Sequence, residues 1–237
     1  ENNIKAVYSR KELNDGELEN LISDVKTGKI DGVNVTVPFK EKIISYIDEL
    51  SPEADTTKSV NTIFLNNGKI NGHNTDIYGF EKALQNTKFN TLNKKIFILG
   101  AGGVVPSIIV ALNKMKVSEI TLSNRTKNKA ETLKNLYKHL NIVDWGEIPD
   151  FDMIINATSV GLNKQESLNL DFSKMKDKFF YDVIYNPNET DFLKNAKKLK
   201  NTIENGKKMF VYQAAAAFKI WHGIEPKINN KIFELLD

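Results

Sequence analysis

Two residues in the first third of the sequence carry side chains that the reduction of a carbonyl group requires. Lys40 ends the segment 34–40, in which Asn34 and Thr36 alternate with apolar residues, as on one side of a β-strand. Asp76 directly precedes an apolar stretch typical of a helix. A ketone oxygen that gains negative charge needs a nearby proton donor and a fixed cation. Alone, Lys40 is typical of a surface charge and Asp76 of a helix N-cap, so the catalytic interpretation depends on both together.

The segment from Lys95 to Thr126 has the order of half a dinucleotide-binding fold. An apolar strand at residues 96–99 leads into the glycine turn 100–103, then a helix, then a second strand at residues 120–123. Glycines let the backbone approach a pyrophosphate at a helix N-terminus. The third glycine position of the usual fingerprint is Val105, but the order of elements still predicts a nucleotide site.

The residues after the second strand indicate NADP as the cofactor. NAD-specific sites usually have an Asp or Glu about 20 residues after the glycines, which binds the ribose 2′-hydroxyl. This sequence has Asn124, Arg125 and Thr126 there, with Lys127 and Lys129 just beyond. An arginine and a nearby ammonium group attract a 2′-phosphate that a carboxylate would repel.

Composition narrows the class of protein. The chain has 237 residues, 41% hydrophobic and 27% charged, which is ordinary for one large or two small globular domains. We expect no membrane partner and a cytoplasmic location, since no apolar run is long enough to span a bilayer and no signal peptide is visible. The chain has no cysteine, and its three histidines lack ligand spacing, so we expect no metal. A net charge of +3 from scattered lysines indicates no nucleic-acid partner. We expect a small-molecule substrate, and the protein to be a monomer or a homodimer.

Strand and helix patterns alternate along the chain in two systems, which predicts an α/β protein. The first system lies before residue 84, the second runs from Lys95 to about Gly206, and a polar hinge lies near residues 86–88. The later apolar strands should be parallel and buried on both faces, with ligands at their carboxyl ends. We expect helices at 13–25, 43–50 and 213–221, and strands at 33–37, 60–64, 69–72, 153–156 and 179–183.

Several short motifs follow one another in a fixed order over essentially the whole chain. They are residues 34–40, 60–62, 74–76 with Gly79 and Phe80, 100–103, 124–126, 156–159 with Gly161, 181–182 with Tyr185 and Pro187, and 213–215 with Phe218 and Trp221. In this order they resemble the shikimate dehydrogenase family. The resemblance implies reversible, NADPH-dependent reduction of 3-dehydroshikimate to shikimate, in aromatic amino-acid biosynthesis.

The resemblance also implies two α/β domains and a set of site residues. Residues 1–84 plus 210–237 would form the smaller substrate-binding domain, and residues 85–209 a Rossmann-type NADP-binding domain. Lys40 and Asp76 would be the catalytic pair. The implied substrate-binding residues are Thr36, Lys40, Asn61, Asp76, Tyr185 and Gln213. The implied cofactor-binding residues are Gly100, Ala101, Gly102, Gly103, Asn124, Arg125, Thr126, Lys129, Thr158, Val183 and Gly206.

One part of the family pattern is not found. Members begin with a strand and a Ser-x-Ser loop that holds the substrate carboxylate, whereas this sequence opens at Glu1, and residues 8–10 do not replace that loop. We therefore expect an absent N-terminal segment, which would leave unpaired strand edges. Two alternatives stay open, a quinate and shikimate dehydrogenase of broader specificity and a non-catalytic NADP-binding remnant.

Overall fold

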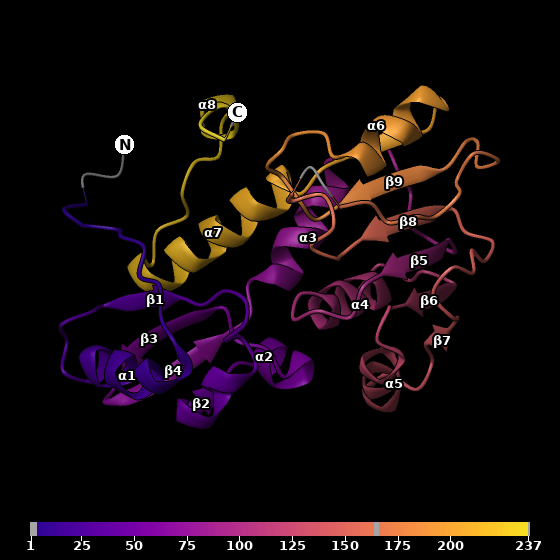
Figure 1. The fold of residues 1–237 in the computed structure, drawn as a ribbon. Coiled ribbons are helices and arrows are strands. Elements are labelled where there is room, and N and C mark those ends of the chain that lie inside the picture. The colour runs from indigo at the N-terminus through magenta and orange to yellow at the C-terminus, as the bar shows by residue number, and fades with distance from the viewer. Residues whose placement is uncertain (1–3, 164–165, 237) are drawn as a thin grey trace. The chain divides into compact units, whose positions relative to one another are not determined.

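The structure is a computed structural model that describes residues 4–163 and 166–236. The chain divides into two units (Figure 1). The first unit ends at Thr75 and includes Ala215–Ile228, and the second comprises Asp76–Ala214 and resumes at Asn229. The expected absence of an N-terminal segment rests on Glu1, which lies outside the described residues.

The first unit contains a four-stranded sheet in the order β1-β3-β4-β2. β3 pairs antiparallel with both β1 and β4, and β2 pairs parallel with β4. The strands are β1 (Gly32–Asn34), β2 (Glu49–Leu50), β3 (Thr62–Asn66) and β4 (Lys69–His73). The helices are α1 (Leu18–Lys26), α2 (Pro52–Thr57) and two 3-10 turns at Asp15–Glu17 and Lys42–Tyr46.

Apolar residues three or four positions apart on α1 account for its packing against this sheet. Leu18, Ile22 and Val25 are buried in one cluster with Ile63 of β3 and Ile70 of β4. This spacing places the three α1 side chains on one helical face.

A helix from the C-terminal part of the chain completes the first unit. Trp221 of α7 (Lys207–His222) donates from Nε1 to the carbonyl oxygen of Ile63, 3.2 Å away and 158 positions earlier in the sequence. Gly32 leaves the room that this indole needs, because a Cβ at Gly32 would lie 2.5 Å from Nε1 of Trp221.

The expected helix at 43–50 is wrong, and the expected strand at 33–37 is too long. Only a 3-10 turn forms at Lys42–Tyr46, and the chain then becomes extended because Asp48 N donates to Ile70 O at 2.9 Å. Ser51 starts a new helix, since its Oγ accepts from Ala54 N. Strand β1 ends at Asn34, so Asn34 and Thr36 are not alternate residues of one strand.

The second unit contains a six-stranded parallel sheet in the order β10-β9-β8-β5-β6-β7. The four central strands confirm the predicted strands to within one residue at either end. β7 and β10 were not predicted. The strands are β5 (Lys95–Leu99), β6 (Glu119–Ser123), β7 (Asn141–Ile142), β8 (Met153–Asn156), β9 (Phe179–Asp182) and β10 (Thr202–Glu204).

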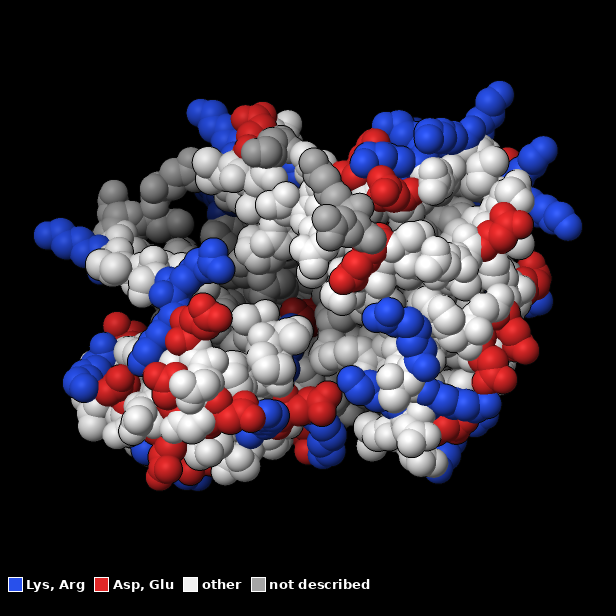
Figure 2. Space-filling model, viewed as in Figure 1, with Lys and Arg blue, Asp and Glu red and all other residues white. Residues whose placement is uncertain are grey.

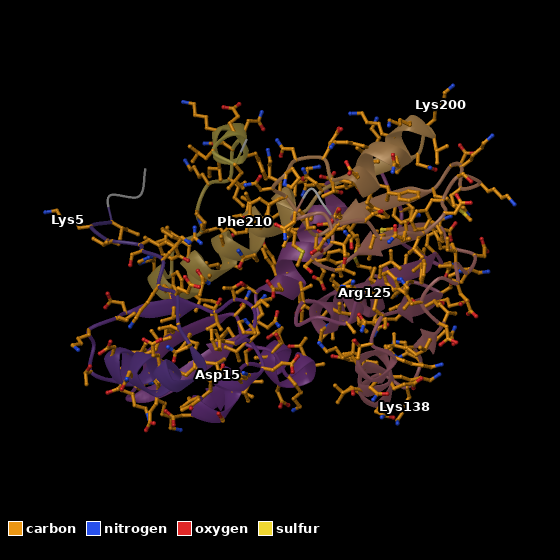
Figure 3. All side chains as sticks on the ribbon, in the orientation of Figure 1. Lys5, Asp15, Arg125, Lys138, Lys200 and Phe210 are labelled. Atoms are coloured by element: carbon orange, nitrogen blue, oxygen red, sulfur yellow. The ribbon has the colours of Figure 1, made fainter. Side chains whose placement is uncertain are left out.

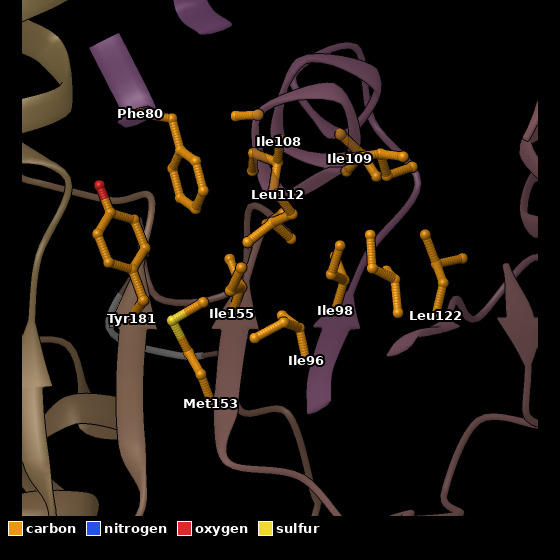
Figure 4. Close-up of a cluster of buried hydrophobic side chains, with 14 of the residues drawn as sticks. Phe80, Ile96, Ile98, Ile108, Ile109, Leu112, Leu122, Met153, Ile155 and Tyr181 are labelled. Atoms are coloured by element: carbon orange, nitrogen blue, oxygen red, sulfur yellow. The ribbon is translucent and has the colours of Figure 1, made fainter. Parts of the chain in front are cut away.

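Helices cover both faces of this parallel sheet. One apolar cluster joins a sheet face to α3, α4, α5 and the start of α7, and a second joins the opposite face to α6. Figure 4 shows the first cluster, where Phe80 lies beside Tyr181 with ring centroids 5.2 Å apart. The helices are α3 (Asp76–Gln85), α4 (Val105–Lys114), α5 (Lys127–Leu136), α6 (Asp191–Lys198) and α8 (Asn230–Glu234).

Replacement of Phe80 tests how much this cluster stabilises the second unit. Phe80 is fully buried, so Phe80→Ala should lower the free energy of unfolding by about 3–5 kcal/mol. Leu136→Ala is the matched control, because Leu136 is 53% exposed and its loss should cost less than about 0.5 kcal/mol. Urea unfolding of both variants measures the difference, and equal costs would contradict this description of the core.

Candidate functional site

Hydrogen bonds join the end of β5 and the start of the following glycine turn to residues at the ends of β6 and β8. Gly100 N donates to Ser123 O of β6 at 2.8 Å, and Ala157 N, after β8, donates to Leu99 O at 2.8 Å. Gly100 has φ +109°, and a Cβ there would lie 2.8 Å from Ala157 O. Only glycine therefore suits this position.

The next part of the turn has the room that a dinucleotide requires. Gly102 is exposed, and a Cβ on it would meet no heavy atom within 4 Å. Pro106 lies in the first turn of α4, where a missing N–H does not interrupt the helix. The open backbone beside a helix N-terminus fits the pyrophosphate of NADP.

The residues after β6 offer positive charge to a 2′-phosphate. Arg125 is exposed (Figure 3), and the preceding Asn124 donates from Nδ2 to Thr126 O at 2.8 Å, which fixes the turn. Lys127 instead contacts Asp144 at 2.6 Å, and this hydrogen bond raises the pKa of Lys127. Arg125 and Lys129 therefore remain the predicted phosphate-binding residues.

The turns after β8 and β9 hold the other predicted cofactor residues. Thr158 is half-buried, and its N and Oγ1 donate to Asn156 Oδ1 at 3.1 and 2.7 Å. Gly206 lies against Val183, since a Cβ on Gly206 would be 2.0 Å from Val183 O. Larger residues at position 206 would therefore separate the turn after β9 from the start of α7.

In the first unit, two adjacent residues fix the backbone near both predicted catalytic residues. Val60 N donates to Lys40 O at 2.8 Å. The buried Asn61 side chain accepts from Thr75 N at 2.9 Å and donates to Thr75 Oγ1 at 2.9 Å. Asp76 follows Thr75 and is the first residue of α3. Asp76 is therefore not the N-cap, which would precede the first helical residue.

Thr36 and Asn34 have different environments. Thr36 is exposed beyond the end of β1. Asn34 is half-buried, donates to Asn61 O at 3.3 Å and accepts from Tyr8 Oη at 2.9 Å. Thr36 is therefore the one of the two whose side chain is exposed to a ligand.

Tyr185 and Gln213 both contact Phe210, which belongs to none of the sequence motifs. The rings of Tyr185 and Phe210 stack with centroids 4.5 Å apart and planes 30° apart. Gln213 Nε2 donates to Phe210 O at 2.9 Å, inside α7 rather than at a helix cap. Figure 3 labels Phe210 on this helix. A contact between positions 185 and 210 leaves no periodic signal in the sequence.

Charge gives no evidence for another kind of site on the face of the molecule drawn in Figure 2. Basic and acidic side chains are interspersed on the face drawn in Figure 2. Among the described residues, no three His, Asp or Glu side chains are grouped so that they could hold a metal ion. None of the helices in that part of the chain is long and apolar enough to cross a bilayer.

A parallel sheet with an open glycine turn and an exposed arginine at its carboxyl edge gives the second unit the Rossmann-like arrangement of dinucleotide-binding oxidoreductases. Family models match residues 1–63 (shikimate dehydrogenase substrate binding domain), 81–198 (shikimate / quinate 5-dehydrogenase) and 208–229 (shikimate 5′-dehydrogenase C-terminal domain). The shikimate dehydrogenase (NADP(+)) of Pelagibacter ubique is 54% identical over 99% of this chain and 89% of its own length. The chain belongs to the shikimate dehydrogenase family.

Solved structures of family members have the same fold. Shikimate dehydrogenase of Aquifex aeolicus matches with a TM-score of 0.85 and 37% identity over 94% of this chain and 83% of its own. The enzyme of Thermus thermophilus, solved in complex with NADP(H) and shikimate, matches with a TM-score of 0.84 and 30% identity, over 94% and 84% of the two chains.

Two glycine substitutions separate cofactor binding from folding. Gly102→Ala should leave the unfolding midpoint unchanged, because its Cβ meets no atom, yet raise the KM for NADPH about tenfold by obstructing the pyrophosphate. Gly100→Ala is the control and should destabilise the protein by about 1–3 kcal/mol, through its positive φ and its contact with Ala157 O. Thermal unfolding and NADPH kinetics measure both effects. An unchanged KM in Gly102→Ala would place the pyrophosphate elsewhere.

Proposed function

We propose that this chain catalyses the reversible, NADPH-dependent reduction of 3-dehydroshikimate to shikimate, with Lys40 and Asp76 as its catalytic pair. The observation that carries the proposal is the backbone arrangement around Val60 and Asn61, which bond Lys40 and Thr75. Family membership over 99% of the chain supports the same reaction. The proposed location is the cytoplasm, and the proposed assembly is a monomer or homodimer.

The proposed domains divide the reaction between them. Residues 1–84 with 210–237 bind the substrate, and residues 85–209 bind NADP. Hydroxyl groups of the substrate ring are bonded by Thr36, Asn61, Asp76 and Gln213, with Tyr185 beside the ring. NADP contacts Gly100, Ala101, Gly102, Gly103, Asn124, Arg125, Thr126, Lys129, Thr158, Val183 and Gly206.

The catalytic pair acts on the oxygen of the carbonyl group. When bound, NADPH supplies the hydride for the ring carbonyl carbon. Lys40 places a positive charge and a proton donor beside the oxygen, where negative charge develops. The carboxylate of Asp76 binds the hydroxyl group that forms, so proton transfer to the oxygen is assigned to these two side chains.

Replacement of Lys40 tests the catalytic role. Lys40→Ala should lower kcat for shikimate oxidation by at least about a hundredfold, because the general acid–base group is lost, while the Kd for NADPH stays unchanged. Lys42→Ala is the matched control, since Lys42 is exposed and bonded to Asp15 at 2.6 Å. Retained turnover in Lys40→Ala would remove the proposed role.

Replacement of Arg125 tests recognition of the 2′-phosphate. Arg125→Ala should raise the KM for NADPH about tenfold or more and leave the KM for NADH almost unchanged, because only NADPH carries the phosphate. Lys138→Ala is the control for a general loss of positive charge, since Lys138 is also exposed. Equal effects on the two cofactors would argue against phosphate binding by Arg125.

A second candidate activity is oxidation of quinate as well as shikimate. The family model that matches residues 81–198 is described as shikimate / quinate 5-dehydrogenase, which favours a test of both substrates. Steady-state kinetics decide between them. A kcat/KM for quinate within about tenfold of that for shikimate would establish the broader specificity.

A further inference from the structure

Asp182, the last residue of β9, has a buried carboxylate that takes no part in the proposed reaction. Its side chain has no exposed surface. Oδ1 accepts hydrogen bonds from Asn156 Nδ2 at 3.1 Å and Ile184 N at 3.0 Å, and Oδ2 accepts from Thr190 Oγ1 at 2.6 Å. Burial of an ionised carboxylate costs free energy that an apolar residue would avoid, which points to a role beyond stability.

The first donor connects Asp182 to the turn after β8. Asn156 uses Nδ2 to bond both Asp182 and Val160 O, the latter at 3.1 Å. Its Oδ1 accepts from the backbone and hydroxyl of Thr158. One amide side chain therefore transmits the position of the Asp182 carboxylate to Thr158.

The other two donors connect Asp182 to the turn after β9. Ile184 N bonds the carboxylate, and Ile184 O accepts from Gly206 N at 3.1 Å. Thr190 bonds the second carboxylate oxygen and also caps α6, since its Oγ1 accepts from Leu193 N at 3.4 Å. The Asp182 carboxylate is thus connected through Ile184 to the turn that contains Val183 and to Gly206, and through Asn156 to Thr158.

We propose that Asp182 is a positioning residue for NADP, whose ionised carboxylate holds the turns after β8 and β9 in the geometry that binds the cofactor. The inference rests on the proposed cofactor-binding roles of Thr158, Val183 and Gly206. Asp182 acts through these three residues and does not touch the cofactor itself.

The protonation state of Asp182 gives the inference a pH signature. Burial raises its pKa to about 6, against hydrogen bonds from Thr190, Ile184 and Asn156 that favour the ionised form. Because this pKa is above that of the unfolded chain, the group stabilises folding below about pH 4, and this stabilisation is lost as the pH rises through about 6. A protonated carboxyl is a weaker acceptor than a carboxylate, so the three hydrogen bonds, and with them NADP binding, should weaken as the pH falls through the same range.

Charged neighbours of this network have partners of their own. Glu189 and Asp191, on either side of Thr190, form ion pairs with Lys197 and Lys194. Across the sheet, burial and then the carboxylates of Glu204 and Asp182 raise the pKa of Tyr181. Tyr181 therefore stays neutral over the pH range in which Asp182 titrates.

The first experiment compares NADP⁺ binding to Asp182→Asn and wild type by calorimetry at pH 7.5. The amide has the same shape but offers one acceptor oxygen, so the Kd should rise about tenfold. The unfolding midpoint should be no lower than that of wild type, because the buried charge is removed. An unchanged Kd would overturn the inference.

A second pair of variants gives an answer even if Asp182→Asn does not fold. Thr190→Val removes the donor to Asp182 and should weaken NADP⁺ binding severalfold. Thr190→Ser keeps the hydroxyl group and should restore the Kd to within about twofold of wild type. Equal affinities in the Val and Ser variants would contradict the positioning role.

The pH profile separates positioning from a general structural role. The 2′-phosphate of NADP⁺ titrates identically with wild type and Asp182→Asn, so the ratio of their Kd values isolates Asp182. This ratio should fall from about ten at pH 7.5 towards one at pH 5, where wild type is itself protonated. A constant ratio would overturn the inference.

All these measurements use NADP⁺ alone. They therefore test the role of Asp182 even if the catalytic role proposed for Lys40 is wrong. A wild-type protein that binds no NADP⁺ would reject both proposals.

Discussion

Close backbone approach at the carboxyl edge of the parallel sheet is the constraint on which the candidate cofactor site depends. Gly100 and Gly206 both lie against carbonyl oxygens, of Ala157 and Val183, at distances that exclude a Cβ. These approaches align the turns after β5, β8 and β9 along one edge. The same edge is where ligands of open α/β sheets bind, because helix N-termini and free backbone groups meet there. The candidate cofactor site would therefore consist mainly of backbone.

The first unit positions its residues in a different way. Buried amide and hydroxyl side chains form hydrogen bonds there: Asn61 bonds Thr75, and Asn74 bonds Thr57 and Ser59 O. Hydrogen bonds of this kind are short-ranged and directional, so the bond from Thr75 N to Asn61 fixes the backbone directly before Asp76. The backbone of Lys40 is bonded by Val60 N. The loop conformation of the 34–40 segment after β1 is consistent with such positioning.

Sequence patterns predicted the parallel sheet well and the irregular regions poorly, for physical reasons. The strands β5, β6, β8 and β9 are buried on both faces, so each is a distinct apolar run. Ile43, Ile44 and Ile47 have the spacing of a helical face, but pairing with β4 decides the conformation of the last residues of the 43–50 segment. Asp182 was noticed only as part of a motif, since sequence cannot reveal that its carboxylate is buried. Phe210 was missed because its contact with Tyr185 joins distant positions.

The contact between Trp221 and the first sheet can form only after α7 has been synthesised. The partner of Trp221, Ile63, belongs to the sheet of the first unit, which leaves the ribosome long before α7 does. Until Trp221 has been synthesised, the space beside Gly32 has no ring to fill it. The sheet of the first unit therefore reaches its final packing only after a residue 158 positions beyond Ile63 has been added to the chain.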